Sequence, residues 1–306
     1  MRRRSLLRTA ASTAAVLALA ACATSGSLAG PGGTGVLRVV AAENFWGSIA
    51  AQLGGRQADV VDIIDNPNAD PHEYEATASD GRAIAAADLV LVNGIGYDTW
   101  ATNLVDANPS PHRVVLSVGD LLGVAPGGNP HRWYNPDDVR LVVSRIVAAY
   151  KKLEPTQAAY FAQQEAEFES TALVPYQAAV AQIKARYSGT PIGASESIMA
   201  MLAPALGLDL VTPPEFLRAV SAGSDPTAMD KATVDAQIKD HRIKVYVYNS
   251  QNATPDIQVQ IAEAHAAGIP VTTITETMVP ATTTWEQWQT AQLLALRDAL
   301  ARATGR

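Results

Sequence analysis

The chain has 306 residues, a formal net charge of −7 and a single cysteine, Cys22. One cysteine excludes an intrachain disulfide, and the acidic balance argues against nucleic acid as a partner. After Cys22 the chain contains no apolar run of the roughly 18 or more residues expected of a membrane-spanning helix. We therefore expect the mature protein to lie outside the bilayer.

The N-terminus has the pattern of a secretory signal peptide. Arginines at positions 2, 3, 4 and 8 precede an alanine-rich apolar stretch, residues 10–21, that is too short to span a bilayer. This stretch ends in Leu19-Ala20-Ala21-Cys22, which resembles a bacterial lipobox. The resemblance implies cleavage before Cys22 and lipidation of its thiol and amine. An ordinary signal peptide with a chance cysteine is the competing interpretation.

The remaining chain exceeds the usual size of a single hydrophobic core, so we expect two domains. Residues 22–35 lack apolar periodicity and favour a flexible tether. Loss of residues 1–21 removes four arginines and no acidic residue, which shifts the formal net charge to −11. The predicted parts are a signal peptide (1–21), a lipid-anchored tether (22–35), a first α/β lobe (36–154), a linking backbone helix (155–188) and a second α/β lobe (189–306).

In the first half of the chain, short β-branched runs alternate with helical patterns. Near-continuous Val, Ile and Leu in these runs favours strands that are buried on both faces, as in a parallel sheet. The patterns predict strands over residues 36–42, 59–64, 88–93 and 113–118, and helices over 46–53 and 79–87.

A long helical tract follows, from about residue 136 to 187, with interruptions near Pro155 and Pro175. Its apolar residues have helical spacing at first, and residues 163–170 are polar and rich in Gln and Glu. A helix that spans two lobes is a stiff strut, so we expect domain closure to be small.

The alternation of strand and helix begins again at Thr190. It predicts strands over residues 191–194, 208–211, 243–248 and 270–275, and helices over 198–206, 228–239, 255–267 and 285–303. Strand and helix alternating within each half indicate an α/β fold of two parallel-sheet lobes.

Four polar side chains, His72, His131, Glu196 and Glu276, each lie in a loop after a predicted strand. Ligands of open parallel sheets bind outside the carboxyl ends of the strands, so these four residues can meet in one cleft, two from each half. Imidazoles and carboxylates bind divalent transition metals. Each residue taken singly is more often a solvated or capping residue, and only their combination indicates a metal site.

The other histidines do not follow this pattern. His112 precedes a predicted strand, and His241 and His265 lie on polar helical stretches. We predict that all three are surface residues.

Several motifs accompany the four loops. They are Ala42-Glu43-Asn44-Phe45-Trp46-Gly47, Asp70-Pro71-His72-Glu73-Tyr74-Glu75, Val92-Asn93-Gly94 with Tyr97 and Trp100, and Asn129-Pro130-His131-Arg132-Trp133. With these motifs the chain resembles the zinc- and manganese-binding cluster A-I solute-binding proteins of bacterial ABC importers, over essentially the whole mature length.

The resemblance implies two lobes joined by one backbone helix, with a metal ion in the cleft between them. It implies that His72, His131, Glu196 and Glu276 are the ligands, and that Zn²⁺ or Mn²⁺ is the transported ion and not a catalytic cofactor. The expected protein is a monomer and not an enzyme. It would be anchored by Cys22 to the outer face of the cytoplasmic membrane, and it would deliver the ion to an ABC permease subunit and its ATPase.

Glu276 is the weakest of the four assignments, because aspartate is the common fourth ligand in the family. Asn249, Gln251 or Asn252 can take its place. The segment 119–131 also lacks the His-rich loop that often precedes the second histidine in zinc importers. Around the ligands we expect supporting roles for Glu43, Asn44, Tyr74, Trp133 and Asn252.

Two further classes of protein compete with this interpretation. Two histidines and a glutamate with a bound water would also describe an exported zinc hydrolase. However, the sequence has no His-Glu-x-x-His motif, and Gly193-Ala194-Ser195-Glu196-Ser197 lacks the final glycine of a nucleophile elbow. A surface adhesin with a structural metal is the third class.

Overall fold

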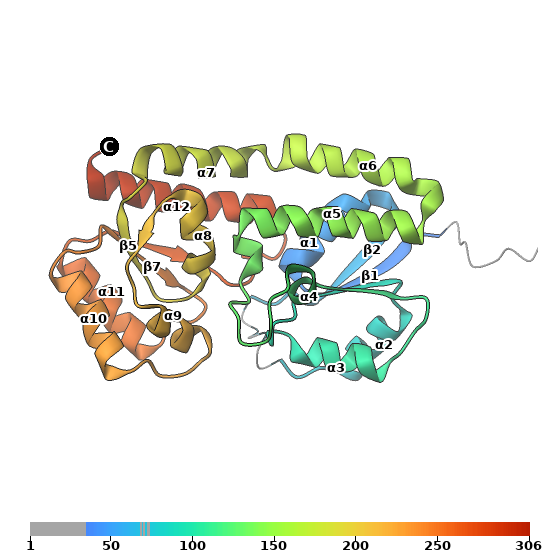
Figure 1. Ribbon diagram of the computed structural model, residues 1–306, viewed down its shortest axis with the longest axis horizontal. Coiled ribbons are helices and arrows are strands. Elements are labelled where there is room, and N and C mark those ends of the chain that lie inside the picture. Colours follow the sequence, from blue (N-terminus) through green and yellow to red (C-terminus); the bar gives the residue numbers. More distant parts are fainter. Residues whose placement is uncertain (1–34, 68, 70, 72–73) are drawn as a thin grey trace, which may run out of the picture. The chain divides into compact units, whose positions relative to one another are not determined.

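Two four-stranded parallel sheets form the centres of two α/β lobes in the computed structural model (Figure 1). The structure describes residues 35–67, 69, 71 and 74–306, and residues 35–306 form one compact unit. The predicted signal peptide, the tether with Cys22, and His72 lie outside the described residues. The predicted fold class, two parallel-sheet α/β lobes, is confirmed.

The first sheet has the strand order β2-β1-β3-β4, and every neighbouring pair is parallel. Near-continuous apolar sequence puts β1 and β3 in the centre, where almost all of their residues are buried. Val39 of β1, for example, lies opposite both Val60 of β2 and Leu89 of β3. The strands are β1 (Leu37–Glu43), β2 (Ala58–Ile64), β3 (Leu89–Val92) and β4 (Val114–Ser117).

The second sheet repeats this topology, with the order β6-β5-β7-β8 and parallel pairing throughout. Its strands are β5 (Pro191–Ala194), β6 (Asp209–Leu210), β7 (Val245–Asn249) and β8 (Val271–Ile274). All eight predicted strands are therefore present, and β6 is reduced to two residues. Both sheets have their carboxyl edges at the place where a ligand is expected.

The helices of the first lobe include two that the sequence analysis did not predict, α3 and α4. They are α1 (Asn44–Gly54), α2 (Ala78–Ala86), α3 (Thr99–Ala107), α4 (Val118–Leu122) and α5 (Pro136–Leu153), with short 3₁₀ turns η1 (Gly55–Gln57) and η2 (Arg132–Tyr134). Local signals explain two of the starts. Thr77 and Asp80 form a capping box at α2, and Asn135 caps α5 ahead of Pro136.

The second lobe contains one helix that was not predicted, α9, which is amphipathic but only eight residues long. Its helices are α8 (Ile198–Leu206), α9 (Pro214–Ser221), α10 (Ala228–Lys239), α11 (Pro255–Ala266) and α12 (Trp285–Thr304). Among the described residues, no helix combines the length and the apolar character needed to cross a membrane.

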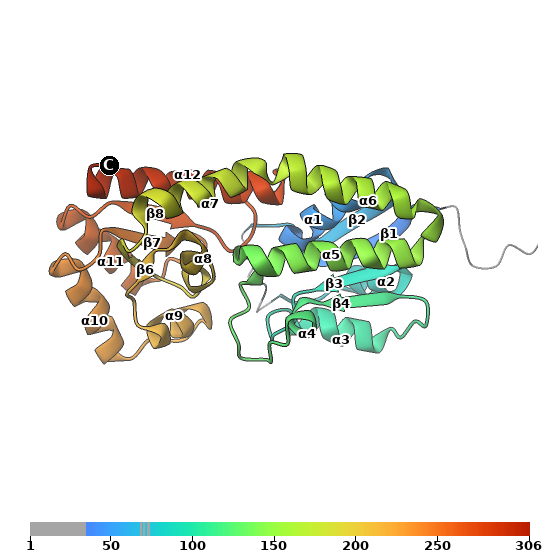
Figure 2. The ribbon, with the colours of Figure 1, turned by 45° about the horizontal axis from the view of Figure 1, so that its top comes forward.

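The predicted helical tract is divided in two by a reversal of direction at Glu154. The chain turns through η3 (Pro155–Gln157), and α6 (Ala158–Glu167) runs back beside α5 in both ribbon views (Figures 1 and 2). A π-helical turn, η4 (Phe168–Ala172), joins α6 to α7 (Val174–Tyr187), which lies along α12 of the second lobe. The chain thus does not break at Pro175, because the π turn just before it carries the helix onward.

One hydrophobic core runs through both lobes and under the α6–α7 segment. It contains buried residues from β1, α1 and α5 of the first lobe, such as Trp46 and Tyr150, and from α8 and α12 of the second, such as Leu202 and Trp285. Phe161, Phe168 and Tyr176 of the linking segment belong to the same core. Both lobes and the linking segment therefore contribute buried residues to one core.

Candidate metal centre

His131, Glu196 and Glu276 come together between the two sheets. Each offers a ligand atom, an imidazole nitrogen or a carboxylate oxygen, and these atoms lie within 4.8 Å of one another. His131 is fully buried, Glu196 is 2% exposed, and the Glu276 side chain is 15% exposed. Among the described His, Cys, Asp and Glu residues, this is the one group with such spacing.

The ends of the strands place these side chains. Glu196 follows β5 by two residues and Glu276 follows β8 by two residues, at the same carboxyl edge of the second sheet. His131 comes from the first lobe, in the loop between α4 and η2. His72, the fourth predicted ligand, lies outside the described residues, between Pro71, which is buried, and Tyr74.

Asn129 and two aromatic rings hold the His131 ring. Oδ1 of Asn129 accepts from the backbone N–H of His131 at 3.0 Å and lies 2.9 Å from Nδ1 of the ring. Trp133 and Tyr97 meet the ring edge to face, with centroids 5.2 Å and 6.3 Å away. Nε2 of His131 points to Glu276, 3.3 Å from Oε1.

Asn249, at the end of β7, brings the two carboxylates together. Its Nδ2 donates to Oε2 of Glu196 at 3.1 Å and lies 3.5 Å from Oε2 of Glu276. Its Oδ1 accepts from the backbone N–H of Gln251 at 2.9 Å. Asn249 therefore presents its nitrogen to the cluster, and in this arrangement it supports the carboxylates and does not replace one of them as a ligand.

Gln251 and Asn252, which the sequence also allowed as the fourth ligand, have different roles in the structure. Oε1 of Gln251 accepts from the backbone N–H groups of Glu276 and Thr277 at 2.7 and 2.9 Å. Nδ2 of Asn252 donates to the carbonyl oxygen of Val220 at 3.3 Å. Gln251 thus shapes the loop that carries Glu276, and Asn252 is attached to the end of α9.

A pair of buried acidic groups lies under the site. Glu43 at the end of β1 and Asp98 at the start of α3 are both fully buried. Burial raises the pKa of the Glu43 carboxyl well above its usual range, and the neighbouring charge of Asp98 raises it further. Burial also raises the pKa of Asp98, but Asp98 accepts backbone N–H bonds from Asn93 and Gly94 at 2.6 and 2.7 Å, which favour its charged form. We therefore assign the proton to Glu43.

Asn93, which begins the turn after β3, ties this layer to the loop of His131. Its Oδ1 accepts from the indole N–H of Trp46 at 3.0 Å, and its Nδ2 donates to the carbonyl oxygen of Pro130 at 3.1 Å. Gly94 follows with φ +70°, and a Cβ there would come within 2.9 Å of the Ser117 hydroxyl. Asn93 belongs to one of the sequence motifs, but its position in that motif does not reveal this role.

The remaining predicted supporting residues divide into two groups. Asn44 accepts from the backbone N–H of Met278 at 3.4 Å, across the lobes, and Trp133 stacks on Phe45 with centroids 3.8 Å apart. Tyr74 instead donates to Asp80 at 3.1 Å, and its ring lies 4.7 Å from that of Trp100. The three histidines predicted at the surface, His112, His241 and His265, are all exposed.

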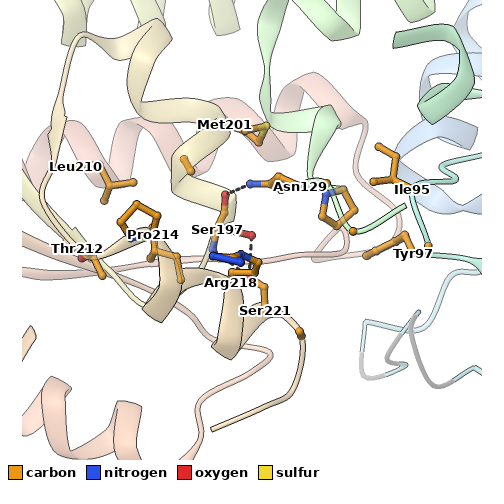
Figure 3. Close-up of a pocket in the computed structure, with 17 residues that line it drawn as sticks. Ile95, Tyr97, Asn129, Ser197, Met201, Leu210, Thr212, Pro214, Arg218 and Ser221 are labelled. Carbon is orange, nitrogen blue, oxygen red and sulfur yellow. Dashed lines mark hydrogen bonds between the residues drawn. The ribbon is translucent and has the colours of Figure 1, made fainter. Parts of the chain in front are cut away.

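A cavity of about 670 Å³ opens beside the cluster, between the loops of the first lobe and α8 and α9 of the second (Figure 3). Tyr97, Asn129 and Ser197 line it on the side of His131, and Met201 and Leu217 are among its apolar lining. Figure 3 shows Asn129 extending from the first lobe to the backbone of Ser197.

Two parallel-sheet lobes, a helical segment that runs along both, and a buried His–Glu–Glu cluster between them define a two-lobed solute-binding fold. The chain belongs to the ZnuA family, "Zinc-uptake complex component A periplasmic", whose model matches residues 39–299.

Curated relatives match parts of the chain. The "Manganese-binding lipoprotein MntA" of Halalkalibacterium halodurans is 31% identical over 115 residues, 36% of this chain and 37% of the relative. The "Manganese ABC transporter substrate-binding lipoprotein PsaA" of Streptococcus anginosus is 28% identical over 159 residues, 48% of this chain and 50% of the relative. Each match thus covers half or less of the relative's length.

Solved structures match over almost the whole fold. The "periplasmic zinc binding protein TroA" of Treponema pallidum has a TM-score of 0.70 at 18% identity, covering 88% of this chain and 99% of that chain. A Mn-bound periplasmic metal binding protein from Candidatus Liberibacter asiaticus has a TM-score of 0.71 at 19% identity, covering 86% of this chain and 98% of that chain. At this identity the likeness shows a common fold.

Proposed function

We propose that this protein is the exported solute-binding component of an ABC-type metal importer. It binds one divalent transition-metal ion, Zn²⁺ or Mn²⁺, between its lobes and delivers the ion to a permease subunit and its ATPase. The observation that carries this proposal is the approach of the ligand atoms of His131, Glu196 and Glu276 to within 4.8 Å. The names of the matched family and relatives, which refer to zinc uptake and manganese binding, agree with it.

The donor set suits such an ion. One imidazole and two carboxylates provide borderline and hard ligands that both Zn²⁺ and Mn²⁺ accept, and the two negative charges neutralise a buried dication. We propose His72 as the fourth ligand, because it follows β2 in the sequence, and β2 ends at the same carboxyl edge of the parallel first sheet as β4, the last strand before His131. Intrinsic affinity for such a site follows the usual order of divalent metals, so Zn²⁺ should bind more tightly than Mn²⁺.

The role we propose is binding and not catalysis. The three described candidate ligands expose at most 15% of a side chain, and their neighbours are hydrogen-bond donors that hold the carboxylates in place. We further propose that the chain acts as a monomer and is held by a lipid on Cys22 to the outer face of the cytoplasmic membrane.

Metal titration of the mature, chelator-stripped protein tests the proposal. We expect one Zn²⁺ or Mn²⁺ per chain by calorimetry and elemental analysis, together with a higher melting temperature, since a ligand that binds only the native state stabilises it. Failure to take up either ion, or uptake at more than one tight site, would contradict the proposal.

Single alanine variants should rank the four ligands. His72→Ala and His131→Ala should weaken binding most, by more than about 100-fold, because each removes a donor from a proline-preceded loop. Glu196→Ala should be intermediate, and Glu276→Ala mildest, because water can enter at the most exposed of the described ligands. His265→Ala, at the exposed end of α11, is the matched control and should bind as the native protein does. If Glu276→Ala abolishes metal binding while His72→Ala still binds the metal, the cleft uses other residues.

A further inference from the structure

Two side-chain amides beside the cluster, Asn129 of the first lobe and Gln251 of the second, make equivalent hydrogen bonds. In each residue, the amide oxygen accepts a hydrogen bond from the backbone of the segment that carries a candidate ligand. The amide nitrogen donates to a backbone carbonyl oxygen of the other lobe. We call these two residues the bridging amides. Both contacts to the other lobe are long-range in the sequence. Asn129 and Ser197 are 68 positions apart, and Gln251 and Pro67 are 184 positions apart.

The orientation of the Asn129 amide follows from its backbone partners. Nδ2 donates to the carbonyl oxygen of Ser197 at 2.7 Å, and Oδ1 accepts from the N–H of His131 at 3.0 Å. A flipped amide would place oxygen against a carbonyl and nitrogen against an N–H, so only one orientation is possible.

This orientation also determines the tautomer of His131. Oδ1 of Asn129 lies 2.9 Å from Nδ1 of the ring and can only accept, so Nδ1 must carry the proton. The Ser197 hydroxyl, 3.2 Å from Nδ1, can accept as well, since it has a second partner in the hydroxyl of Ser221. In the neutral ring, the lone pair is then on Nε2, the nitrogen that faces Glu276. Asn129 thus prepares His131 to bind a metal through Nε2.

Gln251 likewise orients the segment that carries Glu276 and contacts the other lobe. Its Oε1 accepts from two consecutive N–H groups, those of Glu276 and Thr277, at 2.7 and 2.9 Å. Its Nε2 donates to the carbonyl oxygen of Pro67 at 2.8 Å and to the Thr277 hydroxyl at 2.8 Å. Pro67 belongs to the first lobe, on the loop after β2. Two N–H donors on the oxygen again leave one possible orientation.

We propose that Asn129 and Gln251 are positioning residues that couple closure of the lobes to alignment of the metal ligands. When the lobes separate, each bridging amide loses the carbonyl that holds its nitrogen, and the oxygen that orients His131 or the Glu276 loop is no longer fixed. Ligand geometry is therefore complete only in the closed form. This inference rests on the proposed function, because it assigns a role at the same metal site.

Replacing each amide by the acid of the same shape separates the role of its oxygen, which accepts from the ligand segment, from the role of its nitrogen, which donates to the other lobe. Asn129→Asp and Gln251→Glu keep an oxygen for the ligand segment but replace the donor nitrogen with an oxygen that faces a carbonyl. Asn129→Ala and Gln251→Ala remove both roles. Gln163→Glu, at an exposed position on α6, makes the same chemical change away from the site and serves as the control.

The first measurement is the tautomer of His131 in metal-free protein, by ¹⁵N NMR of the imidazole well above the ordinary pKa of histidine. Native protein and Asn129→Asp should show the proton on Nδ1. In Asn129→Ala, part of the population should shift to Nε2, because only the Ser197 hydroxyl remains as an acceptor. A role limited to folding stability would leave this spectrum unchanged, so a native tautomer in Asn129→Ala would overturn the assignment.

The second measurement compares closure and affinity. Amide hydrogen exchange of metal-free protein should be faster around residues 195–200 in both Asn129 variants, and around residues 276–278 in both Gln251 variants, with no change in Gln163→Glu. The alanine variants should lose about 10- to 100-fold in affinity for Zn²⁺, as is usual when a residue that orients a ligand is removed, and the acid variants less. Equal affinity in all five variants would overturn the coupling. If the native protein binds no metal, the proposed function fails, whereas the tautomer and exchange measurements still decide the positioning role.

Discussion

The carboxyl group of Asp62, on β2, is an unusual titratable group of the first lobe. Its Oδ1 is buried with no hydrogen-bond partner among the described residues, and it packs so closely on Gly47 that any Cβ at that position would overlap it. Burial raises the pKa of Asp62 to about 7, with a further contribution from the charge of Asp65. A larger residue at position 47 would therefore require the Asp62 carboxyl group to move.

The stability of the metal-free protein should fall with rising pH because of Asp62. The folded state keeps this proton up to about pH 7, whereas an unfolded chain releases it near 3.8. The stability from this group is thus fully present below about pH 3.8 and is lost as the pH rises to 7. An asparagine at this position cannot ionise, so Asp62→Asn should abolish this decrease in stability with pH. At pH 7.5 the variant should have a free energy of unfolding roughly 2–4 kcal/mol higher than that of the native protein.

Urea unfolding at pH 4, 5.5 and 7.5 with a chelator present measures this effect. The difference between Asp62→Asn and the native protein should grow with pH and be smallest at pH 4. Asp59→Asn, at an exposed position on the same strand, is the control and should change little. A constant difference across the three pH values would mean that Asp62 does not hold its proton in the folded state.

At the scale of elements, the α6–η4–α7 segment has a continuous buried face across both lobes. Phe161 and Phe168 are buried before and within the π turn, and Tyr176 and Ile183 after it. The ring of Tyr176 meets Trp285 of α12 with centroids 5.1 Å apart. The π turn carries an extra residue and so sets the rotation of α7 relative to α6.

Insertion of one further residue in the π turn should therefore be far more harmful than a substitution there. An alanine inserted after Ser170 would rotate α7 by about 100° relative to α6 and turn Tyr176 and Ile183 away from the core. We expect a loss of more than about 3 kcal/mol in the free energy of unfolding, against well under about 1 kcal/mol for Ser170→Ala. Thermal or urea unfolding compares the two variants. Similar stability would show that the linking segment tolerates a change of helical register.

On the scale of the whole molecule, 14 residues of sequence lie between Cys22, the proposed anchor, and the start of β1 at Leu37. Cys22→Ala should therefore release the protein from the membrane fraction while leaving the affinity for Zn²⁺ or Mn²⁺ unchanged. Fractionation with immunodetection and a metal titration of the soluble variant measure both effects. Mass spectrometry of the membrane-extracted native protein should show lipid on Cys22, and an unmodified Cys22 there would exclude the anchor.

The strands could be predicted because their signal is local. Buried parallel strands appear as continuous Val, Ile and Leu runs, and all eight were located within a few residues. The short helices α3, α4 and α9 were not predicted, and segments of five to nine residues carry little periodicity. Length is not the whole reason, because α2 and α8 have nine residues each and were predicted. The turn at Glu154 was expected only as an interruption, since a proline indicates a break but not the direction in which the chain continues.

The sequence by itself determined which residues stand at the carboxyl ends of the strands. From this alone His72, His131, Glu196 and Glu276 could be proposed as one group, because the strands of a parallel sheet end at a common edge. The roles of the side-chain amides could not be predicted in this way. Asn249 and Gln251 were proposed as possible ligands, and only the tertiary structure shows that Asn249 turns its nitrogen to the carboxylates while Gln251 orients the Glu276 loop.

Asn129 is the clearest example of a role that only the tertiary structure decided. Its neighbours in sequence indicate a motif around His131, but its nitrogen bonds to Ser197, 68 residues further along the chain. A side-chain amide has one donor end and one acceptor end, and which end meets a ligand depends on partners that folding brings from the other lobe. The sequence therefore specified the candidate ligands, and the packing of the two lobes specified how they are held.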